Sequence, residues 1–269
     1  MSKTSNSCPN CGLKRSPAST LCPQCDKATF IDKCKAGYDA IDTMPNGKHF
    51  RATVLFLFLN MLLPGIIIAI STMNAQADLA NTLVNSSMGV WSLIIGQFAV
   101  LIAFLLLCRK YLTGVFAKCM NVKAVLAACV LGGIVIVIGF CWDWVKNIIQ
   151  IAVNKNTEAS ILLVKNFPAA SFINMVIGAA LAEEITFRVG VFGFVRRKSR
   201  ILAYIVSAVL FGLVHVDLTG ASVQELLSMP IYIIIGLICA YAYEKYGLLA
   251  NVIVHAMNNL IAWVQIIIA

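Results

Sequence analysis

In the stretch Ala182-Glu183-Glu184-Ile185-Thr186-Phe187-Arg188, three ionisable side chains lie inside an apolar run that begins near Phe167 and ends near Val195. Such a run is long enough to cross a bilayer. Each charge at the centre of a membrane costs roughly 2.5–3.5 kcal/mol on insertion scales. This cost leaves two interpretations of the stretch: an internal ion pair that joins helices, or a functional site within the membrane.

The composition around this stretch is that of a polytopic membrane protein. Apolar residues make up 60% of the 269 residues and charged residues 12%, whereas soluble domains have about 45–50% and about 25%. The net charge of +9 comes from Lys and Arg that lie mostly between apolar runs and in the first 51 residues. This distribution favours topology determination and contact with anionic membrane lipids over nucleic-acid binding.

A charged linker at residues 31–51 leads into a membrane domain, residues 52–269, and His49 in the linker is interpreted as a polar surface residue near the membrane. The fold class is therefore all-α, with about seven transmembrane helices. The Ile-rich, mildly basic stretch 143–167 could lie on the membrane surface or dip into it, so an eighth span is possible there. The seven spans are expected near 52–71, 89–108, 124–142, 168–195, 201–219, 226–243 and 248–268.

The connections between these spans alternate in their content of Lys and Arg. With the N-terminus inside, the connections rich in Lys and Arg fall on the inner side of the membrane. We therefore expect an integral protein of a plasma membrane with a cytoplasmic N-terminus, although an eighth span would reverse everything downstream of it. The counts are eight in residues 1–51, none in 72–88, four in 109–123, three in 143–167, four in 196–200, none in 220–225 and one in 244–247.

Four of the ten cysteines form two Cys-x-x-Cys pairs, Cys8 with Cys11 and Cys22 with Cys25, separated by ten residues. Two such pairs can place four thiolates tetrahedrally around Zn²⁺. We expect residues 1–30 to form a small zinc ribbon whose structural zinc supplies most of its folding energy. The alternative, a pair of disulfides, requires an oxidising compartment, and the expected cytoplasmic location weakens it.

Within the fourth span, the two glutamates have different partners available. On a helix, Glu184 and Arg188 are four residues apart and can pair on one face. Glu183 points about 100° away from Glu184 and is left free for another task. A carboxylate held in an apolar pocket can act as a general base.

Two of the three histidines also lie inside apolar spans, His215 in the fifth and His255 in the seventh, with Asn259 on the same helix face as His255. A single intramembrane histidine is more often a hydrogen-bonding residue between helices than a ligand. Together with Glu183, however, these residues are the parts needed to activate water and hold an oxyanion. Their depths allow them to meet in one cavity open to the cytoplasmic half of the membrane. Asn251 is interpreted as a hydrogen-bonding residue between helices.

The three motifs Glu-Glu-x-x-x-Arg, Phe-x-x-x-His and His-x-x-x-Asn occur in this order, on three spans, with Phe211 as the aromatic position. They resemble the motif set of the type II CAAX prenyl endopeptidase and bacteriocin-processing family of intramembrane proteases (CPBP or Abi family). The resemblance covers about residues 120–269 and leaves the zinc ribbon outside it as an accessory module. It implies an enzyme that hydrolyses a peptide bond near the cytoplasmic half of the membrane.

Carried over by position, the resemblance implies that Glu183 activates the attacking water and that His215 orients this water or holds a metal. His255 and Asn259 would stabilise the oxyanion. The family is usually grouped with metalloproteases, so His215 and His255 are also candidate ligands of a catalytic divalent metal. There is no His-Glu-x-x-His motif, and a metal-independent glutamate mechanism fits these residues equally well.

The same resemblance gives Glu184 and Arg188 the role of holding the helix and the cavity in place. The expected substrate is a peptide or membrane protein. Prenylated CAAX tails are the substrate in the eukaryotic branch of the family, whereas the zinc ribbon favours a prokaryotic host and bacteriocin-like peptides or membrane regulators. Two alternatives stay open: a non-catalytic immunity or scaffold protein of the same fold, and a small transporter that uses Glu183 and Arg188 as a relay.

Overall fold

The computed structural model describes residues 46–71, 82, 85–108, 122–217 and 222–269, and the regular structure of these residues is helical throughout. An all-helical membrane protein therefore agrees with the expected fold class. The zinc ribbon expected in residues 1–30, with its four cysteines, and most of the expected linker lie outside the described residues. The ribbon and its zinc stay predictions.

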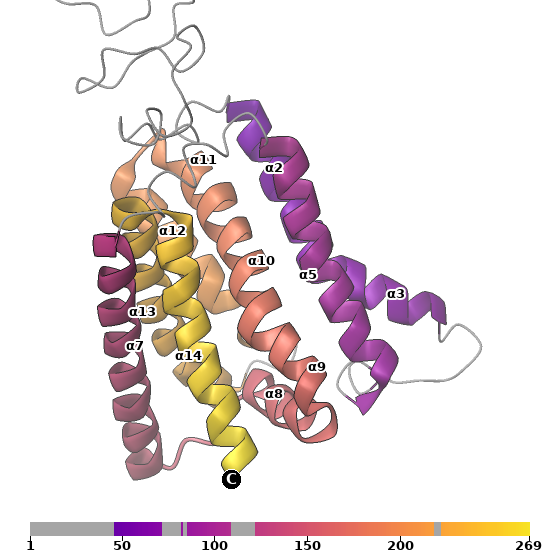
Figure 1. Cartoon of the computed structure of the whole chain (residues 1–269). Helices are drawn as coiled ribbons and strands as arrows, with labels where there is room; N and C mark the ends of the chain where they lie inside the picture. Colours follow the sequence, from indigo (N-terminus) through magenta and orange to yellow (C-terminus); the bar gives the residue numbers. More distant parts are fainter. Residues whose placement is uncertain (1–45, 72–81, 83–84, 109–121, 218–221) are drawn as a thin grey trace, which may run out of the picture.

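The described chain is a bundle of long helices, with several short segments of π-helix inside them (Figure 1). In chain order the elements are α2 (Asn46–Leu57), the π-helical η2 (Phe58–Leu62), α3 (Leu63–Ser71), α5 (Ser87–Cys108), α7 (Val122–Ile149), α8 (Lys155–Asn166), α9 (Pro168–Phe172), the π-helical η3 (Ile173–Ala179), α10 (Ala180–Glu184), the π-helical η4 (Ile185–Phe192), α11 (Gly193–Arg196), α12 (Arg200–Leu213), α13 (Val223–Tyr246) and α14 (Leu248–Ile268).

Five helices in the described part of the chain are long and apolar enough to cross a membrane, and each corresponds to one expected span. The fourth expected span corresponds to the helical run from α9 to α11, and the fifth to α12, an apolar helix of 14 residues. The five are Gly47–Ile70, Ser87–Cys108, Val122–Ile149, Val223–Tyr246 and Leu248–Ile268.

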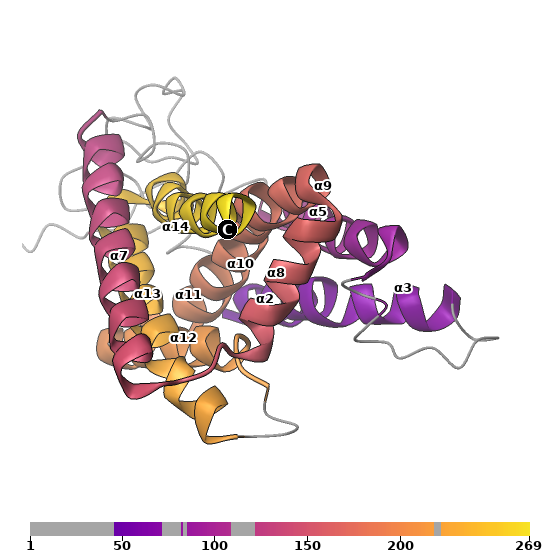
Figure 2. The same cartoon turned by 90° about the horizontal axis from the view of Figure 1, so that it is seen from below.

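After the end of α7, the stretch 143–167 contains no helix long enough to cross a membrane. Helix α7 continues to Ile149, and α8 has only 12 residues, which at about 1.5 Å per residue is far shorter than the roughly 30 Å of a hydrocarbon core. The side chain of Asn154 caps α8 by accepting a hydrogen bond from the backbone N–H of Thr157 at 3.1 Å. Seen from below, α8 lies across the lower end of the bundle (Figure 2).

The bundle has two chemically different ends. Helices α2, α7, α12 and α14 begin, and α5, α11 and α13 end, at the upper end in Figure 1. We call this the basic end, because residues 196–200 and Lys245 lie there. At the opposite end, the α8 end, α7 and α14 finish, α9 and α13 begin, and α8 crosses the bundle.

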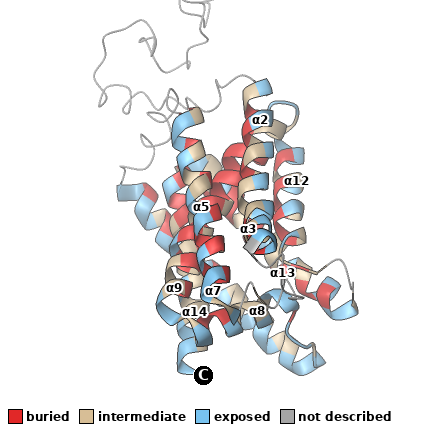
Figure 3. Cartoon of the chain, turned by 90° about the vertical axis from the view of Figure 1, so that its right-hand side faces the viewer, coloured by how far each residue is buried: buried red, intermediate tan, exposed pale blue. Residues whose placement is uncertain are grey.

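Burial separates a packed interior from an apolar outer surface (Figure 3). Large apolar side chains such as Leu106, which is 67% exposed, and Trp144, also 67% exposed, point outward. A surface of this kind suits contact with lipid tails. In contrast, residues 184–193 are all buried, so the middle of the α9–α11 run is surrounded by other helices.

His49 corrects an expectation, because it is fully buried rather than at the surface. Its Nδ1 lies 3.1 Å from the backbone oxygen of Val189 in η4. Helix α2 can approach this closely because a Cβ atom added to Gly193 would lie 2.9 Å from Cε1 of His49. His49 has charged neighbours in the sequence, but it lies in the first turn of α2, and this turn packs against the buried segment 184–193.

A single residue, Gly247, connects α13 to α14. Its φ angle of 90° lies in the region that glycine adopts without steric cost. This tight connection makes α14 return alongside α13, which places His255 in the interior of the bundle.

Candidate active site

Glu184 is fully buried, and three side chains contact its carboxylate. Nε of Arg188 lies 2.8 Å from Oε2, and Nδ2 of Asn251 donates to the same oxygen at 2.5 Å. Nδ1 of His255 donates to Oε1 at 2.8 Å. The pairing of Glu184 with Arg188 that the spacing predicts is therefore present, and Asn251 does bond between helices. This carboxylate joins α10 to α14.

Arg188 extends the same network to α12. Its Nη1 donates a hydrogen bond to Oγ of Ser207 at 2.8 Å, and Ser207 donates to the backbone oxygen of Phe187 at 3.0 Å. The guanidinium carbon lies 5.1 Å from the centre of the Phe211 ring, within the range of a cation–π contact. The ion pair thus holds three helices around one point.

Glu183 has different surroundings from its neighbour. It lines a cavity of about 560 Å³, and its Oε2 is buried yet accepts no hydrogen bond from the residues that the structure describes. Nε2 of His215 lies 3.6 Å from this oxygen and Nε2 of His255 lies 4.0 Å from it. These distances are too long for direct hydrogen bonds but suit a bridging water.

His215 lies just beyond the end of α12, which corrects the expected span 201–219. Its backbone N–H bonds to the oxygen of Gly212 at 3.1 Å, while Nδ1 of its ring lies 2.7 Å from the oxygen of Phe211. The helix ends here because the imidazole takes the carbonyl that the next α-helical bond would use. Since a carbonyl only accepts, Nδ1 carries a proton and Nε2 faces Glu183.

Two further residues fix the ring of His215, and the sequence patterns predict a role at the site for neither. The ring of Tyr232 stacks on it with the centroids 4.6 Å apart and the planes 23° apart. Nδ2 of Asn154 donates to the backbone oxygen of His215 at 3.0 Å and to the hydroxyl of Tyr232 at 3.3 Å. The signals that could have found them are a tyrosine inside an apolar span and an asparagine at a helix start.

Asn259 lines the same cavity but is already engaged with the backbone. Its Nδ2 donates to the oxygen of Met175 in η3 at 2.9 Å, and its Oδ1 accepts from Nδ2 of Asn258 at 3.3 Å. One amide hydrogen therefore ties α14 to η3, and an amide group has only one more to offer a ligand.

One histidine from each of the other two motifs therefore lies within 4.0 Å of the carboxylate of Glu183, and Asn259 lines the same cavity. Residues 165–261 match the Rce1-like family model, described as type II CAAX prenyl endopeptidase Rce1-like. The matched segment contains the three motifs, so the resemblance recognised from them is confirmed for this part of the chain, and the matched model describes an endopeptidase. No curated protein and no solved structure matches the chain.

Three of the motif residues are also candidate ligands of a metal ion. Glu183, His215 and His255 supply one carboxylate and two imidazoles, a donor set known from catalytic zinc sites. However, no group of three or more His, Cys, Asp or Glu side chains within the described ranges is arranged to hold a metal ion. The side chains as placed do not fit a metal, and we assign no step of the reaction to one.

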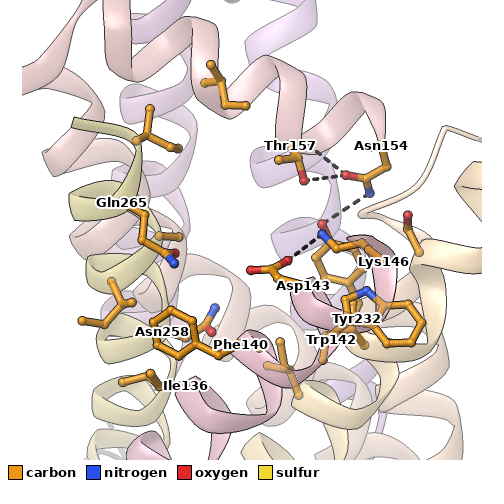
Figure 4. Close-up of a pocket in the computed structure, with 18 of the residues that line it drawn as sticks. Ile136, Phe140, Trp142, Asp143, Lys146, Asn154, Thr157, Tyr232, Asn258 and Gln265 are labelled. Carbon is orange, nitrogen blue, oxygen red and sulfur yellow. Dashed lines mark hydrogen bonds and ion pairs between the residues drawn. The ribbon is translucent and has the colours of Figure 1, made fainter. Parts of the chain in front are cut away.

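A second cavity, of about 450 Å³, adjoins the candidate active site between α7, α8, α13 and α14 (Figure 4). Tyr232 and Asn258 line both cavities. Its wall is largely apolar, with an ion pair between Asp143 and Lys146 at 2.7 Å. The side chain that stacks on His215 therefore also separates two hollow regions.

Proposed function

We propose that the protein is an intramembrane endopeptidase in which Glu183 activates a water molecule for attack on a peptide bond. The observation that supports this most is the contrast between two adjacent glutamates. Glu184 has three partners, and its pairing with Arg188 is complete without Glu183. A second carboxylate, facing a cavity and two imidazoles, is not needed for that pair.

In the proposed reaction, a water molecule donates its two hydrogens to Oε2 of Glu183 and to Nε2 of His215. Its oxygen is then free to attack the carbonyl carbon of the scissile bond. As the new C–O bond forms, Glu183 takes a proton from the water. The proton passes from Glu183 to the leaving nitrogen as the C–N bond breaks. The products are an amine and a carboxylic acid, which keeps the second hydrogen of the water.

Two groups are available for the negative oxygen of the tetrahedral intermediate. Nδ1 of His255 is engaged by Glu184, so Nε2 faces the cavity and in its protonated form donates to the oxyanion. The second amide hydrogen of Asn259 is the other donor. Donors fixed in place before the reaction stabilise such charge most effectively.

The test is the substitution Glu183→Gln, which keeps the size of the side chain and removes the base. Purified protein is assayed on a library of membrane peptides, and we expect cleavage to fall by about 10²–10⁴-fold, with unchanged thermal unfolding. Glu158→Gln, on the exposed side of α8, is the matched control and should cleave like the wild type. Equal cleavage by Glu183→Gln and the wild type would remove the proposal.

A further inference from the structure

The residues that line the catalytic cavity come almost entirely from the half of the bundle nearest α8. Glu183 and His255 lie at the inner limit of this lining, and His215 lies beyond the lower end of α12. The other contributions come mostly from the lower halves of the long helices and from α8 itself. They are Asn60 and Met61 of η2, Leu93 and Gln97 of α5, Asn174, Met175 and Ala179 of η3, Phe211 and Val214 at the end of α12, Tyr232 and Ile235 of α13, residues of α14 between Asn258 and Ile266, and residues of α8 between Asn156 and Leu163.

On the other side of Glu183, toward the basic end, the described residues fill the interior. Residues 184–193 are all buried. A Cβ atom added to Gly190 would lie 2.9 Å from Oγ1 of Thr53, so α2 contacts this segment closely. Apolar side chains that include Phe56 and Phe104 complete the packing. The described residues therefore leave access to Glu183 from the α8 end, not from the basic end.

The second cavity lies at the same end of the bundle. Its lining on α7 runs from Ile136 to Lys146, and on α14 from Asn258 to Ile266, with Ala269 just beyond the end of α14; both stretches lie in the halves that lead to the α8 end. Because Tyr232 and Asn258 line both cavities, the two hollow regions meet beside the ring that stacks on His215. All of the cavity volume described above therefore belongs to one half of the molecule.

The charges indicate which end faces the cytoplasm. Of the 21 Lys and Arg residues, 17 belong to segments whose described helix ends lie at the basic end: eight to residues 1–51, four to 109–123, four to 196–200, and Lys245. Only three lie at the α8 end, in residues 143–167, and the one remaining basic residue is the buried Arg188. By the positive-inside rule, the basic end is cytoplasmic. The sequence predicts both a cytoplasmic N-terminus and a cavity open to the cytoplasmic half of the membrane. With the cavity at the α8 end, these two predictions cannot both hold.

The lining also limits the chemistry of the substrate. Glu183 is the only Asp, Glu, Lys or Arg among the described residues that line the catalytic cavity, whereas six Asn and Gln side chains line it. Nδ2 of Asn174 and Oε1 of Gln97 are buried and have no hydrogen-bond partner among the described residues. One is a donor and the other an acceptor, which complement the C=O and N–H groups of a peptide backbone.

We propose that the catalytic cavity is reached from the extracytoplasmic half of the membrane and receives an uncharged, membrane-inserted peptide segment whose scissile bond lies in that half. The substrate is then a chain that has already entered or crossed the membrane, rather than a soluble cytoplasmic tail. The identity of this ligand as a substrate rests on the proposed hydrolysis, whereas the side from which the cavity is reached does not.

The side is tested by thiol labelling of the full chain with a membrane-impermeant maleimide. Asn156→Cys places a thiol at an exposed position of α8 that lines the cavity, and Lys198→Cys places one at an exposed position of the basic end. Relative to the wild type, which measures labelling of the native cysteines, Asn156→Cys should gain label in intact cells. Lys198→Cys should gain label only after permeabilisation.

Labelling of Asn156→Cys that requires permeabilisation, or that is absent under both conditions, overturns the proposal, and so does labelling of both variants from the same side. The result does not depend on cleavage, so it can be separated from the test of hydrolysis. If Glu183→Gln cleaves like the wild type while Asn156→Cys is labelled in intact cells, the proposed hydrolysis is wrong and the proposed orientation in the membrane is retained.

The substrate class is tested with two single-span reporter peptides that carry the same library-derived segment. In one reporter the segment lies in the outer half of the bilayer, and in the other it lies in the inner half. We expect the wild type to cut the outer reporter at least tenfold faster. Faster cleavage of the inner reporter, or equal cleavage of the two, would contradict the proposed access.

Discussion

At the scale of single residues, Glu183 and Glu184 show how surroundings divide the roles of two identical side chains. Glu184 lies at the centre of a buried network, in contact with Arg188, Asn251 and His255. Glu183 lies against a cavity with no hydrogen bond to its buried oxygen from the described residues. Removing one or the other carboxylate should therefore change different properties of the protein.

Glu184→Ala should destabilise the protein far more than Glu183→Ala does. The first change leaves the guanidinium of Arg188 buried without its carboxylate, which typically costs about 3–5 kcal/mol. The second removes a group that holds nothing together, and we expect no loss of stability beyond about 1 kcal/mol. Denaturant unfolding in a mild detergent measures both, and equal losses would show that Glu183 is also a structural partner.

At the scale of elements, the site depends on the join between α12, α8 and α13. One carboxylate makes this join: Oε1 of Glu225 accepts from the backbone N–H of Lys155 at 2.8 Å, and Oε2 accepts from the backbone N–H of Asp217 at 3.0 Å. Glu225 is itself buried. Because His215 lies two residues before Asp217 and outside any helix, this carboxylate positions the imidazole that faces Glu183.

Glu225→Ala should therefore lower kcat by about tenfold or more, since small misplacements of a catalytic group are costly, with a smaller change in KM. Glu225→Gln retains one acceptor oxygen and should recover part of the rate. Steady-state cleavage of one library peptide by the two variants gives the comparison. Equal losses in both, or a change confined to KM, would argue against a positioning role.

The contacts between helices are also the features of the structure that the sequence does not predict. Apolar runs and basic connections predict the helices and their order, because the length of a segment and the free energy of transferring it from water into the membrane are properties of the whole segment. The end of α12 depends instead on one ring nitrogen of His215 that competes for the carbonyl of Phe211. The buried position of His49 likewise depends on a glycine 144 residues away, Gly193.

The sequence likewise predicts some features of the candidate site and not others. Helical spacing predicts the pairing of Glu184 with Arg188 and the separate direction of Glu183. The motifs predict that His215 and His255 approach it. The stacking of Tyr232 and the support from Asn154 come from α13 and α8, whose positions relative to α12 no local pattern records. These contacts exist only once the bundle is assembled.

At the scale of the whole molecule, the chain joins a membrane domain to an expected zinc module at its N-terminus. The full chain should bind about one Zn²⁺, and Cys8→Ser with Cys11→Ser should abolish it, because a tetrahedral site loses two of its four thiolates. Cys129→Ser, an exposed thiol on α7, is the control and should retain the metal. Elemental analysis of the purified proteins gives the stoichiometry.

Metal content and cleavage then separate two sites that one chain could contain. If zinc belongs only to the N-terminal thiolates and Glu183 acts without a metal, the double serine variant should lose zinc and keep its cleavage of membrane peptides. Zinc that persists in this variant would place a metal among Glu183, His215 and His255. Cleavage that is lost on chelation of this residual zinc and restored by adding zinc back would make that metal part of the reaction, and the carboxylate would no longer be sufficient to activate water.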